Sequence, residues 1–69
     1  MEAVKIETEY ITLGQMLKLA NVIQSGGHAK AFLAEANITV NGEPENRRGR
    51  KLYRGDRIVV AEYGEYEIA

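Results

Sequence analysis

The chain has 69 residues, a net charge of −1, no cysteine and no tryptophan. That length suits one small domain, so we expect a single unit over residues 1–69. Without cysteine there is no disulfide framework, and the single histidine, His28, falls short of the roughly four Cys or His ligands of a structural zinc site. No apolar run approaches the roughly 18 residues of a membrane span, and the first residues lack the basic start and apolar block of a signal peptide. We therefore expect a soluble cytoplasmic protein with no cofactor and no membrane partner.

The small size also favours a binding surface over an enclosed active site. A chain this short buries only about 60% of its unfolded surface, and a deep pocket would remove core that it needs. Ser25 and His28 lie in one Ser-Gly-Gly-His stretch, which is more typical of a helix start than of a catalytic pair. Because nothing else supplies a nucleophile, a positioned base or a metal site, we expect a protein that is not an enzyme and has no small-molecule substrate.

The first third of the chain predicts one strand and one helix. Residues 4–8 alternate apolar and polar side chains, as a half-buried strand does. Thr12 is the predicted N-cap of a helix over residues 13–20, and Gln15, three residues on, completes a capping box.

A second helix and a hairpin follow. Apolar residues recur at helical spacing over 26–36 and predict the second helix. Ser25 is the predicted N-cap of this helix, and Asn37 is the candidate left-handed residue at its C-terminal end. The short connection predicts that the two helices pack on each other. Residues 38–40 then read as a strand, and Asn41-Gly42 is the strongest short hairpin signal.

The rest of the chain predicts further antiparallel strands. Pro44 places the returning segment at a sheet edge, residues 53–56 predict a turn, and residues 57–60 and 66–68 predict strands separated by a turn at Tyr63-Gly64. The fold class is therefore α+β, with an N-terminal strand, two packed helices and a small, mostly antiparallel sheet of about four to five strands. The predicted core consists of Ile11, Leu13, Leu17, Phe32, Leu33, Ile38, Val40, Leu52, Ile58 and Val60.

Charge is segregated along the chain. Residues 1–24 carry a net charge of −1, residues 25–57 carry +3, and residues 58–69 carry −3. The window 47–57 holds six bases and one acid, and five of the six bases are arginine, which forms planar bidentate contacts with phosphate. A solvated basic loop is the simplest interpretation. The acidic surroundings of the window favour a nucleic-acid interface, and so does Tyr53 as a candidate for stacking on a base, although a core tyrosine is at least as good an interpretation of that residue.

Three motifs in this order resemble the S4 RNA-binding domain, named after a small-subunit ribosomal protein. They are Ile38-Thr39-Val40-Asn41-Gly42, then Gly49-Arg50-Lys51-Leu52, then Gly55-Asp56-Arg57-Ile58-Val59. The resemblance covers about residues 11–60. The start of the second helix, Ser25-Gly26-Gly27-His28-Ala29-Lys30, is similar to that of the small stand-alone members, the YaaA and YbcJ type. The resemblance implies an αL-type S4-like fold that binds structured RNA, often ribosomal RNA, without catalytic activity.

The sequence departs from the wider family at both helix starts. Gly26 stands where many members have an arginine that meets RNA, and Thr12-Leu13-Gly14 replaces the usual Arg-Leu-Asp. A glycine-rich helix start leaves backbone N–H groups uncovered for a phosphate. The pair Gly26-Gly27 costs about 1 kcal/mol per residue in helix propensity, which indicates close approach of either the RNA or the neighbouring strand.

These residues give a predicted RNA-binding face. Its main members form an electropositive surface between the second helix and the basic loop: Lys30, Arg47, Arg48, Arg50, Lys51 and Arg54. Ser25, Gly26 and Gly27 are additional candidates at the helix start, although capping is the simpler role for Ser25. His28 is a candidate for stacking or phosphate contact, although an uninvolved surface histidine is the simpler interpretation, and Lys18 is a candidate that points the same way.

The predicted function is binding of structured RNA, ribosomal RNA or a ribosome precursor, by a monomer. One alternative is a protein-interaction module, because a small sheet with exposed edges can accept a partner strand. Another is non-specific DNA binding, although no recognition helix with base-reading residues is evident. Competition between folded RNA and duplex DNA distinguishes these hypotheses.

Overall fold

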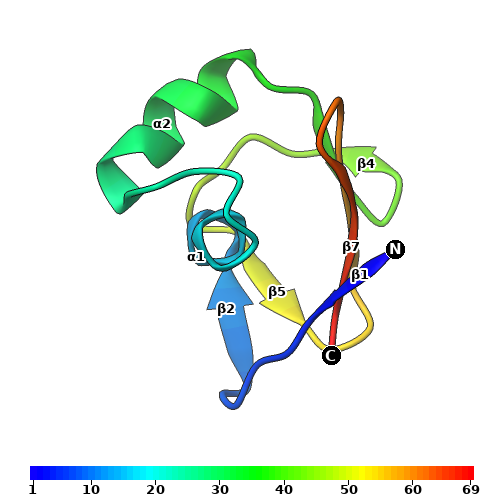
Figure 1. Ribbon diagram of the computed structural model, residues 1–69. Helices are drawn as coiled ribbons and strands as arrows, with labels where there is room; N and C mark the ends of the chain where they lie inside the picture. The colour runs from blue at the N-terminus through cyan, green and yellow to red at the C-terminus, as the bar shows by residue number, and fades with distance from the viewer.

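Two helices and seven short strands make up the chain, and the computed structural model describes residues 1–69 (Figure 1). In chain order they are β1 (Glu2–Val4), β2 (Tyr10–Thr12), α1 (Leu13–Leu19), α2 (Gly26–Glu35), β3 (Ile38–Val40), β4 (Glu43–Pro44), β5 (Lys51–Tyr53), β6 (Arg57–Val60) and β7 (Gly64–Ile68). Five strands form one sheet in the order β1-β7-β6-β3-β4, while β2 and β5 form a separate antiparallel ribbon. Only the β1–β7 pair is parallel. The predicted α+β class is confirmed.

Both helices lie on the same side of the large sheet, and the β2–β5 ribbon lies beside α1 (Figure 1). The core between these layers contains sixteen buried apolar side chains and no buried polar or charged residue. All ten predicted core residues belong to this layer, although Phe32 is only partly buried. The prediction omitted Val4, Ile6, Met16, Ile23, Ala29, Tyr66 and Ile68. No polar or charged residue belongs to this core, so the candidate ligand-binding side chains lie around it rather than within it.

The predicted capping box at the start of α1 is confirmed. The Thr12 hydroxyl accepts a hydrogen bond from the Gln15 backbone N–H at 3.3 Å, and the Gln15 side-chain oxygen accepts one from the Thr12 N–H at 2.9 Å. The helix ends at Leu19, and the chain reverses through Asn21, whose φ is +61°. Neither helix has the length and apolar character needed to cross a membrane.

Two local predictions in the first half are wrong. The strand expected at residues 4–8 is β1, at Glu2–Val4, and the ribbon strand β2 was not predicted. Three residues carry too little periodicity to be recognised, and β2 exists because it pairs with β5, about forty residues away. Asn37 does not have the predicted positive φ. The helix ends instead at Ala36, whose extended backbone (φ −80°, ψ 148°) directs the chain into β3.

The two predicted turns at Asn41-Gly42 and at residues 53–56 are confirmed, and hydrogen bonds join them to each other. Asn41 and Gly42 have φ values of +52° and +85°, the left-handed pair of a type I′ hairpin turn. The Asn41 side chain donates to the Asp56 carboxylate at 3.0 Å and accepts from the Arg57 N–H at 2.9 Å. Asp56 in turn accepts from the Tyr53 N–H at 2.8 Å. This network joins the β3–β4 turn to the β5–β6 turn and fixes where the intervening basic loop begins and ends.

Candidate nucleic-acid interface

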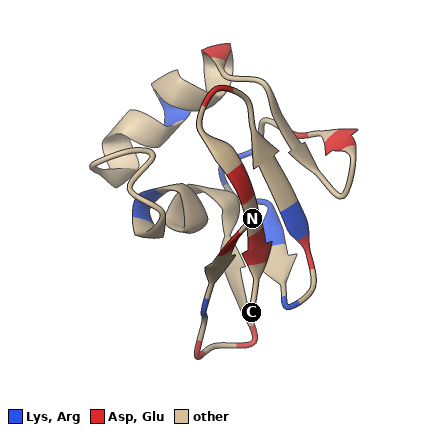
Figure 2. Cartoon of the chain, turned by 45° about the vertical axis from the view of Figure 1, so that its right-hand side comes forward, with Lys and Arg blue, Asp and Glu red and all other residues tan.

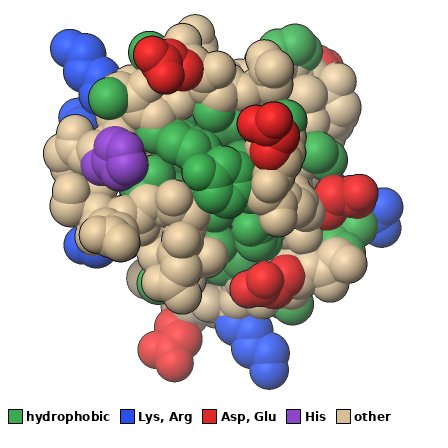
Figure 3. Space-filling model, turned by 45° about the horizontal axis from the view of Figure 1, so that its top comes forward, with side chains coloured by type: hydrophobic (Ala, Val, Ile, Leu, Met, Phe, Trp, Pro, Cys, Tyr) green, Lys and Arg blue, Asp and Glu red, His purple; other side chains and the backbone are tan.

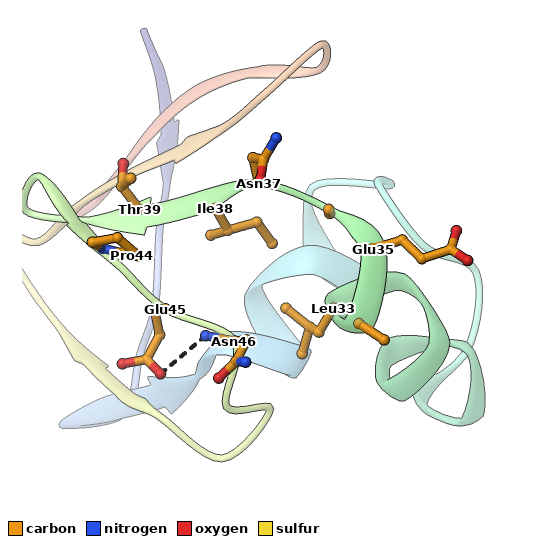
Figure 4. A pocket seen from close by; sticks show the side chains of 10 residues that line it. Leu33, Glu35, Asn37, Ile38, Thr39, Pro44, Glu45 and Asn46 are labelled. Carbon is orange, nitrogen blue, oxygen red and sulfur yellow. Dashed lines mark hydrogen bonds between the residues drawn. The ribbon is translucent and has the colours of Figure 1, made fainter.

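The loop between β4 and β5 is folded around one carboxylate. The Glu45 side chain is only 7% exposed and accepts hydrogen bonds from the backbone N–H groups of Asn46 and Arg47. It also pairs with the Arg47 Nε at 2.9 Å and the Arg50 Nη1 at 2.8 Å. Figure 4 shows the Glu45 carboxylate turned away from the apolar side chains of Leu33 and Ile38. The hydrogen bonds from Arg47 and Arg50, Arg47 first, outweigh the opposing effect of burial and hold the pKa of Glu45 far below its ordinary 4.5.

The same loop is docked on the start of α1. The Leu13 N–H donates to the Arg50 carbonyl at 2.8 Å, and the Gly14 N–H donates to the Arg48 carbonyl at 3.0 Å. The Arg48 stem lies against Gly14 so closely that a Cβ at this position would stand 2.7 Å from Arg48 Cγ. Gly14 therefore leaves room for the Arg48 stem, a role that the sequence did not predict. The available signal was a glycine in the first turn of a helix, where it costs about 1 kcal/mol in propensity.

Arg48 is the only arginine whose guanidinium has no hydrogen bond and no ion pair within the protein. Arg47 and Arg50 donate hydrogen bonds to Glu45 and Arg54 donates one to the Ile6 carbonyl, while Arg57 forms only a longer ion pair with Glu67, at 3.8 Å. A guanidinium without an internal partner keeps all its donors for a ligand. Arg48 therefore has the greatest capacity among the arginines to bind an external anion.

Arg48 lines a groove of about 340 Å³ between the two helices, which we call the interhelical groove. Lys18 and Gly26 line it too, so three of the predicted site residues meet here. The remaining lining residues are Thr12, Gly14, Gln15, Ala29 and Gly49, and none of the eight carries a negative charge. The groove combines two cations with the start of α2, an environment suited to phosphate.

The start of α2 is uncovered. The Ser25 backbone has the extended conformation of an N-cap, but its side chain makes no capping hydrogen bond, so the predicted side-chain cap is wrong. A Cβ at Gly26 or Gly27 would meet nothing within 4 Å. The neighbouring strand therefore does not explain the glycine pair, whose backbone faces open space.

A second groove of about 590 Å³, which we call the loop groove, continues the basic surface. It is lined by Arg47, Gly49, Arg50, Lys51, Tyr53 and Asp56. Because Gly49 lines both grooves, the two are contiguous. The acidic residues of β7, Glu65 and Glu67, lie on the large sheet instead (Figure 2).

Five predicted residues line neither groove, and two of them, Ser25 and Gly27, flank Gly26 at the start of α2. The other three are Arg54, Lys30 and His28. Arg54 donates to the Ile6 carbonyl at 2.8 Å and so anchors the segment between β1 and β2. Lys30 is exposed on α2 and lines no groove. His28 belongs to a different surface, because its ring packs edge-on against Phe32 with the ring centroids 6.4 Å apart.

The surface around His28 is a groove of about 660 Å³ with a mixed polar and apolar lining, which we call the aromatic groove. Phe32 and Tyr63 pack edge-to-face there with ring centroids 5.5 Å apart, and Glu35 and Glu62 also line it. Figure 3 shows the hollow beside the histidine, with hydrophobic side chains at its centre. It contains no basic side chain other than His28, so it does not extend the predicted RNA-binding face.

Comparison with known proteins gives two concordant results. Residues 4–69 match the S4 domain. The chain is also 58% identical over 65 residues to a protein of Bacillus subtilis (strain 168) described as "Probable ribosome maturation protein RlbA", covering 94% of this chain and 92% of that protein. Both matches include the helices and the basic loop, so the similarity extends over the two basic grooves.

Proposed function

Since the chain belongs to the S4 domain family, we propose that it binds structured RNA, without catalysing a reaction, through the interhelical and loop grooves. The name of the similar B. subtilis protein concerns ribosome maturation. We therefore propose ribosomal RNA, or a precursor of a ribosomal subunit, as the partner, bound by a monomer.

The observation that carries this proposal is the unpaired Arg48 beside Lys18 and the uncovered start of α2. Two cations and free backbone N–H groups converge on one groove without a carboxylate, an arrangement that favours a phosphate. Gly26 removes the arginine that many family members place here, and Arg48 supplies a guanidinium to the same groove from the loop. In our proposal Arg48 takes over the missing contact.

Glu45 has the role of positioning the loop. It holds Arg47 by two side-chain hydrogen bonds, from Nε and Nη2, and Arg50 by one. The remaining donors of Arg47 stay free, and its side chain is 70% exposed. Fixing a long side chain before binding reduces the entropy that is lost when the ligand arrives. Arg47, Arg50 and Lys51 then bind phosphates from a prearranged loop.

Phosphate contacts position a protein but do not read sequence, so the shape of a folded RNA is the expected determinant of specificity. The carboxylates of Glu65 and Glu67 on β7 disfavour approach of RNA to the large sheet and so help to orient it.

The test is fluorescence anisotropy with a folded ribosomal RNA fragment at several salt concentrations, with duplex DNA as competitor. The variant is Arg48→Gln, and the matched control is Arg57→Gln, which removes the same charge from the exposed face of β6. Loss of one charged hydrogen bond, roughly 1.5 kcal/mol, weakens binding by about tenfold. Loss of one phosphate contact also lowers the salt slope of log affinity by about 0.7 to 0.9. Equal effects of the two variants would show that Arg48 is not at the interface.

Equal affinity for RNA and duplex DNA, unchanged in Arg48→Gln, would instead favour a protein-interaction module. The aromatic groove is the surface that supports this second candidate, because it combines two edge-packed rings with two carboxylates that suit a basic partner. Tyr63, 57% exposed, is the residue whose replacement by alanine would then abolish binding of such a partner.

A further inference from the structure

The outer face of the β2–β5 ribbon carries two tyrosines and a lysine. Tyr10 and Tyr53 are paired across the ribbon, with ring centroids 5.8 Å apart and ring planes at 47°. The Lys51 Nζ lies 5.0 Å from the Tyr10 ring centroid, a cation–π contact. Ile11 and Leu52, also paired in the ribbon, are 7% and 0% exposed and point into the core. One face of the ribbon is therefore buried in the core, and the other face exposes the two tyrosine rings to solvent.

These rings remain accessible. Tyr10 is 38% exposed and Tyr53 is 44% exposed. A cross-strand aromatic pair contributes roughly 0.2–1 kcal/mol to a sheet, which accounts for the pairing of the rings but not for their joint exposure beside a cation. An exposed aromatic surface flanked by positive charge is the arrangement that proteins use to stack nucleic-acid bases.

The pair also lies beside the two basic grooves. Tyr53 and Lys51 line the loop groove. Tyr10 lines a neighbouring hollow of about 810 Å³ together with Gln15 and Lys18, which also line the interhelical groove, and with one carboxylate, Glu9. A strand whose phosphates follow the basic surface therefore passes the two rings.

We propose that Tyr10 and Tyr53 form a stacking platform for an unpaired base of the bound RNA, with Lys51 on the adjoining phosphate. This inference rests on the proposed function and narrows its ligand class. Paired bases in an RNA helix are stacked on their own neighbours, whereas bases in loops, bulges and ends offer a free face to an aromatic ring. The platform therefore selects RNA in which a helix adjoins unpaired nucleotides.

The experiment distinguishes stacking on bases from binding of phosphates. One probe is an RNA hairpin with a short unpaired uridine extension, and the second is the same hairpin with an abasic extension, so that the phosphate charges are equal. The wild-type protein is expected to prefer the uridine probe by about fivefold or more. Tyr10→Leu and Tyr53→Leu are expected to lose that preference and keep the affinity for the abasic probe. Their salt slope is expected to stay unchanged, because no charge is removed.

Controls keep the result independent of folding. Tyr10→Phe and Tyr53→Phe retain the rings and are expected to keep the preference, while Tyr63→Leu removes an exposed tyrosine outside the basic surface and is expected to leave it unchanged. Thermal melts verify that each variant is folded at the assay temperature.

Each failure has a separate meaning. If the wild-type protein binds both probes equally, with a steep salt slope and in preference to duplex DNA, the platform is refuted and the proposed function stands. Equal losses for both probes in the leucine variants also refute it, because they indicate only a structural role for the rings. If neither RNA binds better than duplex DNA, the proposed function itself fails.

Discussion

Replacement of Gly14 by alanine tests the packing that holds the basic loop on α1. The new Cβ would stand 2.7 Å from Arg48 Cγ and 3.5 Å from the Arg48 carbonyl oxygen. The Cγ atom moves away only if the Arg48 side chain turns about its Cα–Cβ bond, which takes the stem off the helix. The loop backbone is held at Arg48 and two residues further on by the hydrogen bonds that the Arg48 and Arg50 carbonyls accept from α1. The loop must therefore shift as a unit, or the Arg48 stem must leave the helix.

Two effects of opposite sign decide the stability of Gly14→Ala. Alanine raises helix propensity by about 1 kcal/mol. Overpacking against a fixed neighbour costs about 1–3 kcal/mol. With an intermediate cost of about 2 kcal/mol, we expect a net loss of about 1 kcal/mol, which corresponds to a fall in Tm of roughly 4–8 °C for a domain of this size.

Gly27→Ala is the matched control, because a Cβ at Gly27 in α2 meets nothing within 4 Å. Here only the propensity effect remains, and we expect stabilisation by about 0.5–1 kcal/mol. Thermal and urea unfolding followed by circular dichroism measure both variants. Opposite signs support the packing argument, whereas stabilisation by both variants would show that Arg48 does not rest on Gly14. Gly14→Ala should also weaken RNA binding without a change in net charge, since it displaces Arg48.

Three further predictions concern the residues that frame the site. Glu45→Gln should flatten the acid limb of the stability curve: the folded-state pKa of Glu45 lies below its ordinary 4.5, so its contribution is complete above that value and is lost as the pH falls below it. Urea titrations from pH 6 to pH 3 check this, and parallel curves for the two proteins would contradict the role of Glu45 as the anchor of Arg47. Thr12→Ala removes the cap of α1 and should destabilise by about 1 kcal/mol, whereas Thr12→Ser should retain most of the stability. Asn41→Ala loses bonds to Asp56 and to the backbone of β6 and should cost about 2 kcal/mol, measured by thermal melts; a cost below about 0.5 kcal/mol would show that the two turns are not coupled.

Local sequence signals determined the parts of this fold that depend on near neighbours. The capping box of Thr12 and Gln15 marks the start of α1, and Asn41-Gly42 marks a hairpin turn, because each feature is formed within a few residues. The spacing of apolar residues identified both helices and most of the core for the same reason. The three motifs from 38 to 59 also carried the family resemblance, since their turn residues recur in order.

The tertiary structure decided which basic residues are available to a ligand. The sequence shows five arginines of equal charge, and only the fold shows that three donate hydrogen bonds within the protein, that Arg57 forms an ion pair, and that Arg48 does neither. It also brings Tyr10 of β2 beside Tyr53 of β5 and places Gly14 under the Arg48 stem. The Tyr10–Tyr53 and Gly14–Arg48 contacts join residues more than thirty positions apart. The hydrogen bonds of the arginines depend on direction and on distances of a few ångströms. Composition and periodicity carry no information on such distances, so the number of charges could be predicted from the sequence while their availability could not.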